Sequence, residues 1–321
     1  MVPSAIRRGL RRVLGESAAA AATSEIASVA SAPPQKNYDR EIETLRYQVD
    51  YLLLEVSRLR SLVRHLTAGK TDELPLLAQT RESFEYQWDA TPDGNWIDTR
   101  PELKEREPRI VCEYTRLPRE WFAGKRVLDA GCGSGRFTYA FASMGAIVTA
   151  VDQSAAGVMH TRRSAAEFGD RVTVAQHDLT TPLQLASQFD LVWSYGVLHH
   201  TGDTYGAFRN IARLVKTGGY LFMMLYGEPT GRDAGEFAYY AEVERLRRDT
   251  ATLSFGDRYA AITAAKGADA GGWFDAVSPR INDTYAFYEI ELWLLREGFT
   301  GITRTKEQSS HCVIAQRSDT V

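Results

Sequence analysis

The chain has 321 residues, of which 44% are apolar and 25% charged, so it is long enough for one large domain with attachments or for two domains. A net charge of −3 gives no general attraction to nucleic acid, and we expect no nucleic-acid partner. Three scattered cysteines and the lack of an apolar run of roughly 18–20 residues exclude a disulfide framework and a membrane-spanning helix, and favour a cytoplasmic protein.

Residues 1–36 are predicted to be a flexible basic segment rich in alanine and serine. The stretch "IRRGLRRVLG" places its apolar residues on one helical face, with its arginines mostly on the other. Such a helix could lie on an anionic membrane surface through residues 5–14, which would make the protein peripheral to the inner face of the membrane. The alternative is a frayed or partner-docked terminus. The Ala/Ser-rich stretch that follows, up to Pro33-Pro34, is typical of a linker.

Residues 37–69 are predicted to form a coiled-coil helix, because apolar residues alternate in steps of three and four. They are Ile42, Leu45, Val49, Leu52, Val56, Leu59, Val63 and Leu66. The a positions are all β-branched and the d positions are all leucine, which favours two parallel strands and hence a homo-oligomer through residues 42–66. Leu53 and Leu62 widen the apolar stripe, so a higher oligomer or a helix packed on its own domain stays open.

From Arg126 to Leu225, strand-like apolar runs alternate with helical stretches. "RVLDAG", "AIVTAVD", "VTVAQHD", "FDLVWSYG" and "GGYLFMMLYG" are the expected strands. Repeated β–α alternation predicts an α/β fold with a mainly parallel sheet covered by helices. Ligands of such sheets bind at the carboxyl ends of the strands.

The turn "VLDAGCGSGR" contains Gly131, Gly133 and Gly135 in a G-x-G-x-G spacing. A dinucleotide fingerprint would need glycine at Arg136, and no phosphate-binding P-loop is present in the sequence. Asp129 before the turn would repel a pyrophosphate but suits an ammonium and a sulfonium. Asp152 ends the second strand, where a carboxylate can accept hydrogen bonds from ribose hydroxyls. The pattern therefore indicates S-adenosylmethionine.

Residues 126–227 resemble class I S-adenosylmethionine-dependent methyltransferases of the UbiE-like, type 11 group. The matching motifs are "VLDAGCGSGR", "AVDQS", "AQHDL", "FDLVWSYGVLHH" and "LVKTGGYLFMMLY", with Thr217 a departure that affects only a turn. The resemblance implies a Rossmann-like, mainly parallel seven-stranded sheet with helices on both faces and an antiparallel final strand. It also implies a methyltransferase domain at 80–321, with its core at 124–227 and 285–318 and a substrate-side insertion at 228–284.

The resemblance and the turn together give a set of cofactor-binding candidates. They are Asp129, Gly131, Cys132, Gly133, Gly135, Asp152, Gln153, Asp178, Leu179 and Ser194. The family motif implies that Asp178 lies near the adenine amino group, with the Leu179 backbone close by. Cys132 is interpreted as a small residue in a tight turn, and the three aspartates could instead be capping or turn residues. The remaining histidines lack the grouping of metal ligands, so we expect no metal site.

His199 and His200 follow the fourth strand in "GVLHHTGD", near the expected methyl group. Methyl transfer to a hydroxyl needs alignment of the nucleophile and a base, and histidine is the natural base near neutral pH. Both are catalytic candidates without a preference between them. Because relatives often carry "LHH" whatever their substrate, a structural role for at least one is the alternative.

Acceptor choice is expected to depend on residues 84–102 and on the insertion. The insertion is rich in aromatic residues: Phe237, Tyr239, Tyr240, Phe255, Tyr259, Trp273 and Phe274. Rings with carboxylates suit a glycan, and "SFEYQW" loosely resembles bacterial methyltransferases from surface-glycan gene clusters. We therefore expect O-methylation of a sugar or glycoconjugate intermediate. The alternatives are a lipid-like or aromatic small molecule at the membrane, a coiled-coil assembly protein with an inactive domain, and aromatics that only pack the insertion's own helices.

Overall fold

The computed structural model describes residues 41, 74–90, 97, 99–185, 188–228, 234–306 and 310–318, and of residues 234–237 the backbone alone. The chain divides into two units, Met1–Arg60 and Ser61–Val321, and the description below concerns the second. The predictions for residues 1–36 and, apart from Glu41, for the coiled-coil helix 37–69 lie outside the described residues. Within the described part, no helix has both the length and the apolar character needed to cross a bilayer.

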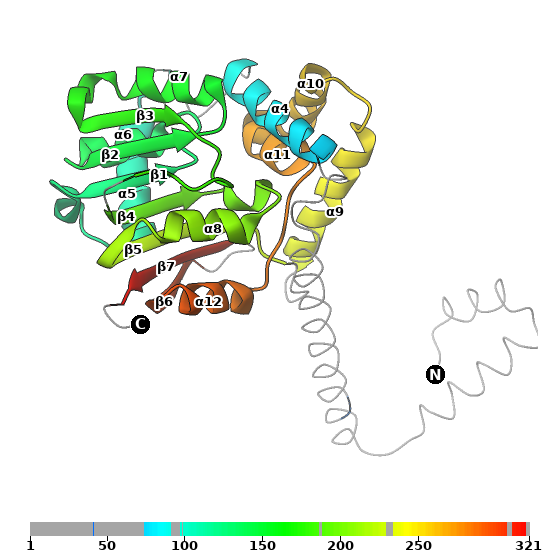
Figure 1. Cartoon of the computed structure of the whole chain (residues 1–321). Helices are drawn as coiled ribbons and strands as arrows, with labels where there is room; N and C mark the ends of the chain where they lie inside the picture. The colour runs from blue at the N-terminus through cyan, green and yellow to red at the C-terminus, as the bar shows by residue number, and fades with distance from the viewer. Residues whose placement is uncertain are drawn as a thin grey trace, which may run out of the picture. The chain divides into compact units, whose positions relative to one another are not determined.

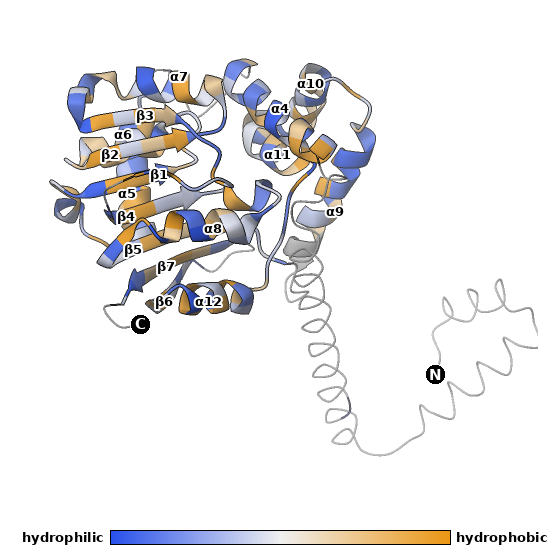
Figure 2. Cartoon of the chain, in the orientation of Figure 1, coloured by the Kyte–Doolittle hydropathy of each residue, from blue (hydrophilic) through white to orange (hydrophobic). Residues whose placement is uncertain are grey.

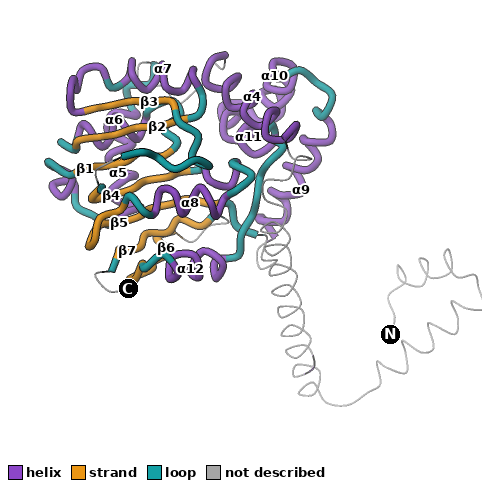
Figure 3. The backbone as a smooth tube through the Cα atoms, viewed as in Figure 1, coloured by secondary structure: helices purple, strands orange, loops and turns teal. Residues whose placement is uncertain are grey.

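The described strands form one seven-stranded sheet in the order β3-β2-β1-β4-β5-β7-β6 (Figures 1 and 3). Their bounds are β1 Arg126–Ala130, β2 Ile147–Asp152, β3 Val172–Gln176, β4 Phe189–Tyr195, β5 Val215–Leu225, β6 Phe299–Lys306 and β7 His311–Arg317. Strands β1 to β5 pair in parallel, and β7 runs antiparallel between β5 and β6. The predicted seven-stranded α/β fold with an antiparallel final strand is confirmed.

Helices cover both faces of this sheet, as the β–α alternation predicts. They are α5 Leu103–Thr115, α6 Arg136–Ser143, α7 Ala155–Ser164, α8 Thr204–Ala212 and α12 Phe287–Arg296. In Figure 1, α5 and α6 lie behind the strands, and α8 and α12 lie in front of them. Short 3-10 turns connect some elements, including η3 Ala166–Arg171 and η4 Leu198–His200.

Two apolar cores follow from the alternation of side chains along each strand. Leu128 and Val192 point to the face covered by α8 and α12, whereas their neighbours Val127 and Trp193 point to α5 and α6. Trp193 is fully buried and stacks on Phe222, with ring centroids 4.0 Å apart. The strands are accordingly mostly hydrophobic in Figure 2, while the helices show hydrophilic residues as well. Burial of each large apolar side chain stabilises the sheet by about 1.5–3 kcal/mol.

A second group of helices lies beyond the carboxyl ends of the parallel strands (Figure 1). It contains α4 Leu74–Ala90 and the insertion helices α9 Ala234–Asp249, α10 Phe255–Lys266 and α11 Ala270–Val277, with the 3-10 turn η5 Gly267–Asp269. Hydrogen bonds tie α4 to the chain after α11: Ser83 Oγ lies 2.7 Å from Ser278 Oγ, and the Ile281 amide donates to Thr80 Oγ1 at 3.0 Å.

The aromatic residues expected to recognise a glycan pack this group instead. Phe274 is fully buried and lies in one apolar cluster with Tyr239, Phe255, Tyr259 and Trp273. Tyr240 donates its hydroxyl hydrogen to the Gly227 carbonyl, and the Phe237 side chain lies outside the described residues. The alternative, that these rings pack the insertion's own helices, is what the structure shows. A small group of helices needs its own core to stay folded, and these rings supply it.

Candidate functional site

A cavity of about 380 Å³ opens at the carboxyl ends of the parallel strands, between the sheet and the second group of helices. The glycine turn, the ends of β2 and β3, the ends of β4 and β5, α4 and α11 all contribute to its wall. Of the predicted cofactor residues, seven line this cavity: Gly131, Cys132, Gly133, Asp152, Gln153, Asp178 and Leu179. The parallel strand ends therefore bring together residues that are far apart in the sequence.

The glycine turn needs glycine for two physical reasons. Gly131 and Gly133 have φ values of +91° and +49°, which side chains disfavour. A Cβ atom on Gly131 would lie 2.3 Å from the side chain of Val197, and one on Gly133 would lie 2.8 Å from the ring of Trp88. The turn is thus closely covered by Trp88 of α4 and by Val197 in the loop after β4, and it lines the cavity.

Asp152 fastens this turn to the end of β2. Its Oδ2 accepts from the Gly133 amide at 2.8 Å, and its Oδ1 accepts from the Ser154 amide at 2.9 Å. Burial raises the pKa of Asp152, and these two amide donors oppose the shift. Each carboxylate oxygen has a second lone pair, and the residue lines the cavity, so hydroxyl groups of a ribose can still bind it.

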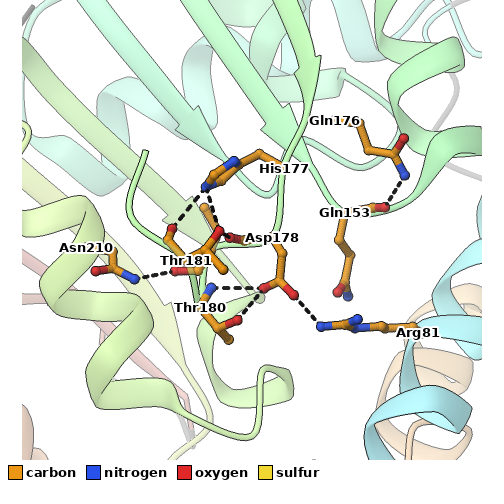
Figure 4. A network of polar contacts seen from close by, with 9 residues as sticks. Arg81, Gln153, Gln176, His177, Asp178, Thr180, Thr181 and Asn210 are labelled. Atoms are coloured by element: carbon orange, nitrogen blue, oxygen red, sulfur yellow. Dashed lines mark hydrogen bonds and ion pairs between the residues drawn. The ribbon is translucent and has the colours of Figure 1, made fainter. Parts of the chain in front are cut away.

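Asp178 follows β3 at the end of a polar network (Figure 4). Its carboxylate accepts from the Thr180 amide at 2.9 Å and forms an ion pair with Arg81 of α4. The side chain of Asn210 donates to the Leu179 carbonyl at 2.9 Å and holds the same loop. The segment is therefore fixed from both sides, with Asp178 and Leu179 on the cavity wall.

Three predicted cofactor residues do not line the cavity. Asp129 is 1% exposed and accepts from Thr138 Oγ1 at 2.6 Å, and burial raises its pKa to about 7. Ser194 is fully buried and donates to the Ala130 carbonyl at 3.0 Å. Both residues lie inside strands, so their side chains point to the faces of the sheet rather than off its edge. Gly135 begins α6, where a Cβ atom would approach Thr161.

The two candidate histidines differ in their access to the cavity and in their hydrogen bonds. His199 is fully buried, its ring lies between His200 and Tyr226, and neither ring nitrogen has a hydrogen-bond partner among the described residues. Burial holds its pKa well below the usual value. His200 lines the cavity, and its Nδ1 lies 2.8 Å from the Ile281 carbonyl oxygen. Because a carbonyl only accepts, Nδ1 carries the proton and Nε2 keeps its lone pair.

The rest of the wall was not predicted residue by residue. Phe84, Trp88 and Arg100 come from the segment 84–102, for which the sequence predicts a role in acceptor choice without indicating individual residues. Four further lining residues were not predicted from the sequence: Phe137, Tyr195, Tyr226 and Asp275. The first three have a local signal, because Phe137 lies in the first turn of α6, Tyr195 ends β4 and Tyr226 follows β5. Asp275, in contrast, has no local signal in the sequence of α11.

Arg136 contributes a positive charge to the wall of the cavity. Its guanidinium carbon lies 4.2 Å from the ring centroid of Phe137 and 5.2 Å from that of Tyr195, and its Nη1 lies 3.4 Å from Oε2 of the buried Glu107. Glu107 also pairs with Arg106. No group of three or more potential metal ligands occurs among the described residues.

The sheet order, the glycine turn after β1 and the acidic residues after β2 and β3 define a class of protein. Residues 128–223 match the family model described as a methyltransferase domain. This match identifies residues 128–223, which lie within the seven-stranded sheet described above, as a methyltransferase domain.

The chain is also similar to curated proteins. The ubiquinone biosynthesis O-methyltransferase of Pseudomonas aeruginosa (strain LESB58) is 33% identical over 166 residues, which is 50% of this chain and 62% of the relative. The protein of the same name from Vibrio vulnificus (strain YJ016) is 32% identical over 132 residues, 40% of this chain and 56% of the relative. The chain thus spans more than half but less than two thirds of the length of these curated relatives.

Solved structures with a similar backbone include two other methyltransferases. The magnesium protoporphyrin IX methyltransferase from Synechocystis PCC 6803 with bound SAH is 19% identical with a TM-score of 0.46, covering 81% of this chain and 100% of that one. The N-methyltransferase NodS from Bradyrhizobium japonicum WM9 is 17% identical with a TM-score of 0.47, covering 75% of this chain and 100% of that one.

Proposed function

We propose that this protein is an enzyme that transfers the methyl group of S-adenosylmethionine to a hydroxyl group of a small organic acceptor. The observation that carries the proposal is one cavity whose wall contains both His200 and the group formed by the glycine turn, Asp152 and Asp178, which we call the cofactor end. S-adenosylmethionine supplies a methyl group made electrophilic by the attached sulfonium. The protein has to bind the donor and the acceptor, align the acceptor hydroxyl with the methyl group and remove the hydroxyl proton.

The cofactor end of the cavity fits this donor better than a phosphorylated nucleotide. Asp152 and Asp178 both face the space, and carboxylates suit ribose hydroxyls and amino groups but repel phosphates. The absence of Cβ atoms at Gly131 and Gly133 lets Val197 and Trp88 pack against the turn, and both glycines line the cavity. Asp129 would act from behind the turn, through Thr138 and α6, rather than by direct contact.

His200 is the better of the two candidate bases. Its Nδ1 proton is held by the Ile281 carbonyl, which fixes the ring and leaves Nε2 as an acceptor. When bound, S-adenosylmethionine would supply the methyl group and leave as S-adenosylhomocysteine, and His200 Nε2 would accept the proton of the acceptor hydroxyl. Burial lowers the pKa of His200 to about 4, so the ring is neutral at physiological pH and its Nε2 lone pair is free, while it is a weaker base than a histidine in water.

The acceptor proposed first is a sugar or a glycoconjugate intermediate. The wall outside the cofactor end combines the rings of Tyr195 and Tyr226 with the polar side chains of Gln87 and Asp275, a mixture that stacks on and hydrogen-bonds to polyhydroxyl compounds. The second candidate is an aromatic or lipid-like hydroxyl compound, which the names of the ubiquinone biosynthesis relatives favour.

A transfer assay with methyl-labelled S-adenosylmethionine tests the proposal and chooses between these acceptors. The panel contains nucleotide sugars, glycolipids and small phenols, and the product is checked for an O-methyl group by mass spectrometry. Label in a sugar supports the first candidate, and label in a phenol supports the second. If the protein does not bind S-adenosylmethionine at all, the assembly-protein alternative replaces the enzyme.

The N-terminal predictions remain proposals of their own. We propose a cytoplasmic protein that self-associates through residues 42–66 and contacts the membrane surface through residues 5–14. Flotation with vesicles containing anionic lipid tests the membrane contact. Deletion of residues 1–15 should abolish flotation, and binding that survives the deletion would reject a role for that segment.

A further inference from the structure

Asp275 carries a carboxylate for which the fold provides too few partners. It lies on α11 in the insertion and lines the cavity. Its Oδ1 atom has no access to water and no hydrogen-bond partner among the described residues. Gln87 of α4 donates a hydrogen bond to the same carboxylate. One oxygen is therefore satisfied by the protein, and the other is not.

A buried oxygen without a partner is costly, and native structures rarely keep one without a reason. The groups that interact with Asp275 through a hydrogen bond or electrostatically come from four parts of the fold, and among the described residues none forms an ion pair with it. They are Gln87 of α4, Arg136 of α6, Tyr226 after β5 and Tyr239 of α9. Arg136 is directed to Glu107 instead. No second donor for this oxygen is present among the residues that the structure describes.

Asp275 and the proposed base border the same part of the cavity. The Tyr226 ring lies 5.6 Å from that of His200, centroid to centroid, and burial, followed by the charge of Asp275, raises the pKa of Tyr226. All three residues line the cavity. A molecule held against His200 would therefore present its neighbouring groups to Asp275.

We propose that Asp275 binds the acceptor, its free oxygen accepting a hydrogen bond from a second hydroxyl next to the one that is methylated. This inference rests on the proposed function and names its substrate class: acceptors with at least two hydroxyl groups, uncharged near the reacting oxygen. A single-hydroxyl analogue leaves the carboxylate unpaired, which is the strongest form of discrimination that a polar pocket offers. An anionic group at this point is repelled.

Ionisation of Asp275 gives the inference a second signature. Burial raises its pKa to about 6, opposed by the hydrogen bond from Gln87 and the charge of Arg136. Above that pH the carboxylate can only accept, as the proposal requires. Below it, one oxygen carries a proton and the acceptor loses its partner, so the KM for the acceptor should rise as the pH falls below about 6.

The test compares Asp275→Asn with Asp269→Asn, a matched change of an exposed carboxylate that ends η5 of the same insertion. The probes are two pairs that differ by one hydroxyl: catechol with phenol, and methyl glucoside with its 2-deoxy analogue. Wild type and Asp269→Asn should prefer the first member of the accepted pair. In Asp275→Asn, the KM for that member should rise about 10- to 100-fold, and its dependence on pH near 6 should disappear.

Two further readouts separate the inference from the function on which it rests. S-adenosylhomocysteine should bind all three proteins within about threefold, because Asp275 lies outside the cofactor end. The thermal midpoint of Asp275→Asn should equal or exceed that of wild type, since a partly unsatisfied buried charge is removed. Transfer with an unchanged hydroxyl preference, or a midpoint lowered by several degrees, overturns the inference alone. No transfer by wild type to any acceptor overturns the proposed function, and the inference with it.

Discussion

The guanidinium of Arg81 on α4 forms an ion pair with the carboxylate of Asp178, which follows β3 at the cofactor end of the cavity (Figure 4). Trp88, two helical turns further along α4, covers Gly133 of the glycine turn. The Glu85 side chain accepts from the amide of Ala156 at 3.1 Å. Helix α4 therefore fastens to three parts of the proposed cofactor site.

Replacement of Arg81 by alanine should loosen this cover without unfolding the domain. The side chains of Arg81 and Asp178 are 51% and 29% exposed, so the pair contributes at most about 1 kcal/mol. We expect S-adenosylhomocysteine to dissociate about two- to fivefold faster, as measured by stopped-flow fluorescence. Arg81→Lys, which keeps the charge, should lie between alanine and wild type. Slower dissociation from Arg81→Ala would contradict the role given to α4.

Asp129 should make the domain less stable as the pH rises. Its pKa is about 7 when folded and 3.8 in the reference state, so between these values the folded protein binds more protons than the unfolded one. The stabilisation is complete below about pH 4 and is lost through pH 7, amounting to no more than about 4 kcal/mol.

Denaturant unfolding at several pH values measures this contribution. Asp129→Asn keeps an oxygen that can accept from Thr138 but does not titrate in this range. The difference in unfolding free energy, wild type minus variant, should therefore fall from pH 4 to pH 8. A difference that does not change, or that rises, would show that Asp129 is ionised in the folded protein at low pH.

The two histidines should respond differently to substitution. His200→Asn retains a donor for the Ile281 carbonyl but removes Nε2, so kcat should fall about 10²- to 10⁴-fold with little change in cofactor affinity. His199→Phe keeps the aromatic packing between His200 and Tyr226 and should retain most of the activity. Because the pKa of His200 is about 4, protonation of this ring should lower kcat/KM only below about pH 5. If His199→Phe lost more activity than His200→Asn, His199 rather than His200 would be the base.

Local patterns in the sequence predicted the fold and most of the cofactor end. Strand alternation, the glycine turn and the acidic residues after β2 and β3 are encoded by short stretches, and the sheet brings their ends together. Asp129 and Ser194 show where this reasoning stops. Both lie in a matching motif, yet strand geometry turns their side chains to Thr138 and to the Ala130 carbonyl.

The acceptor end could not be predicted in this way. The aromatic residues of the insertion looked suited to a ligand, but a group of helices this small needs them for its own core. Asp275 reaches the cavity only because α11 packs beside α4, and that contact joins residues nearly 200 positions apart, as in the hydrogen bond between Ser83 and Ser278. Local patterns in the sequence cannot predict a contact between residues so far apart.

Self-association through residues 42–66 should depend on the leucines at the d positions. Leu52→Lys with Leu59→Lys places charges in the predicted seam, and light scattering should then show the mass of a monomer. Ser57→Lys, at a predicted exposed position of the same segment, should leave the oligomer intact. A wild-type protein that is monomeric at micromolar concentration would reject this proposal without affecting the methyltransferase domain.

The central claim is that the cavity holds S-adenosylmethionine against the glycine turn and Asp152. Asp152→Ala removes the oxygens that accept from Gly133 and Ser154 as well as those offered to the ligand, so affinity should fall at least about 100-fold. The affinity of Asp152→Asn, which still offers one accepting oxygen, should fall less. Isothermal titration calorimetry of the folded variants gives these affinities directly.

Calorimetric titration of the wild-type protein with S-adenosylmethionine is the most direct test. One site per chain, lost in Asp152→Ala while circular dichroism stays that of a folded protein, is the result that we predict. Absence of binding to the wild type, equal binding to both proteins, or preferred binding of a phosphorylated dinucleotide would contradict the account.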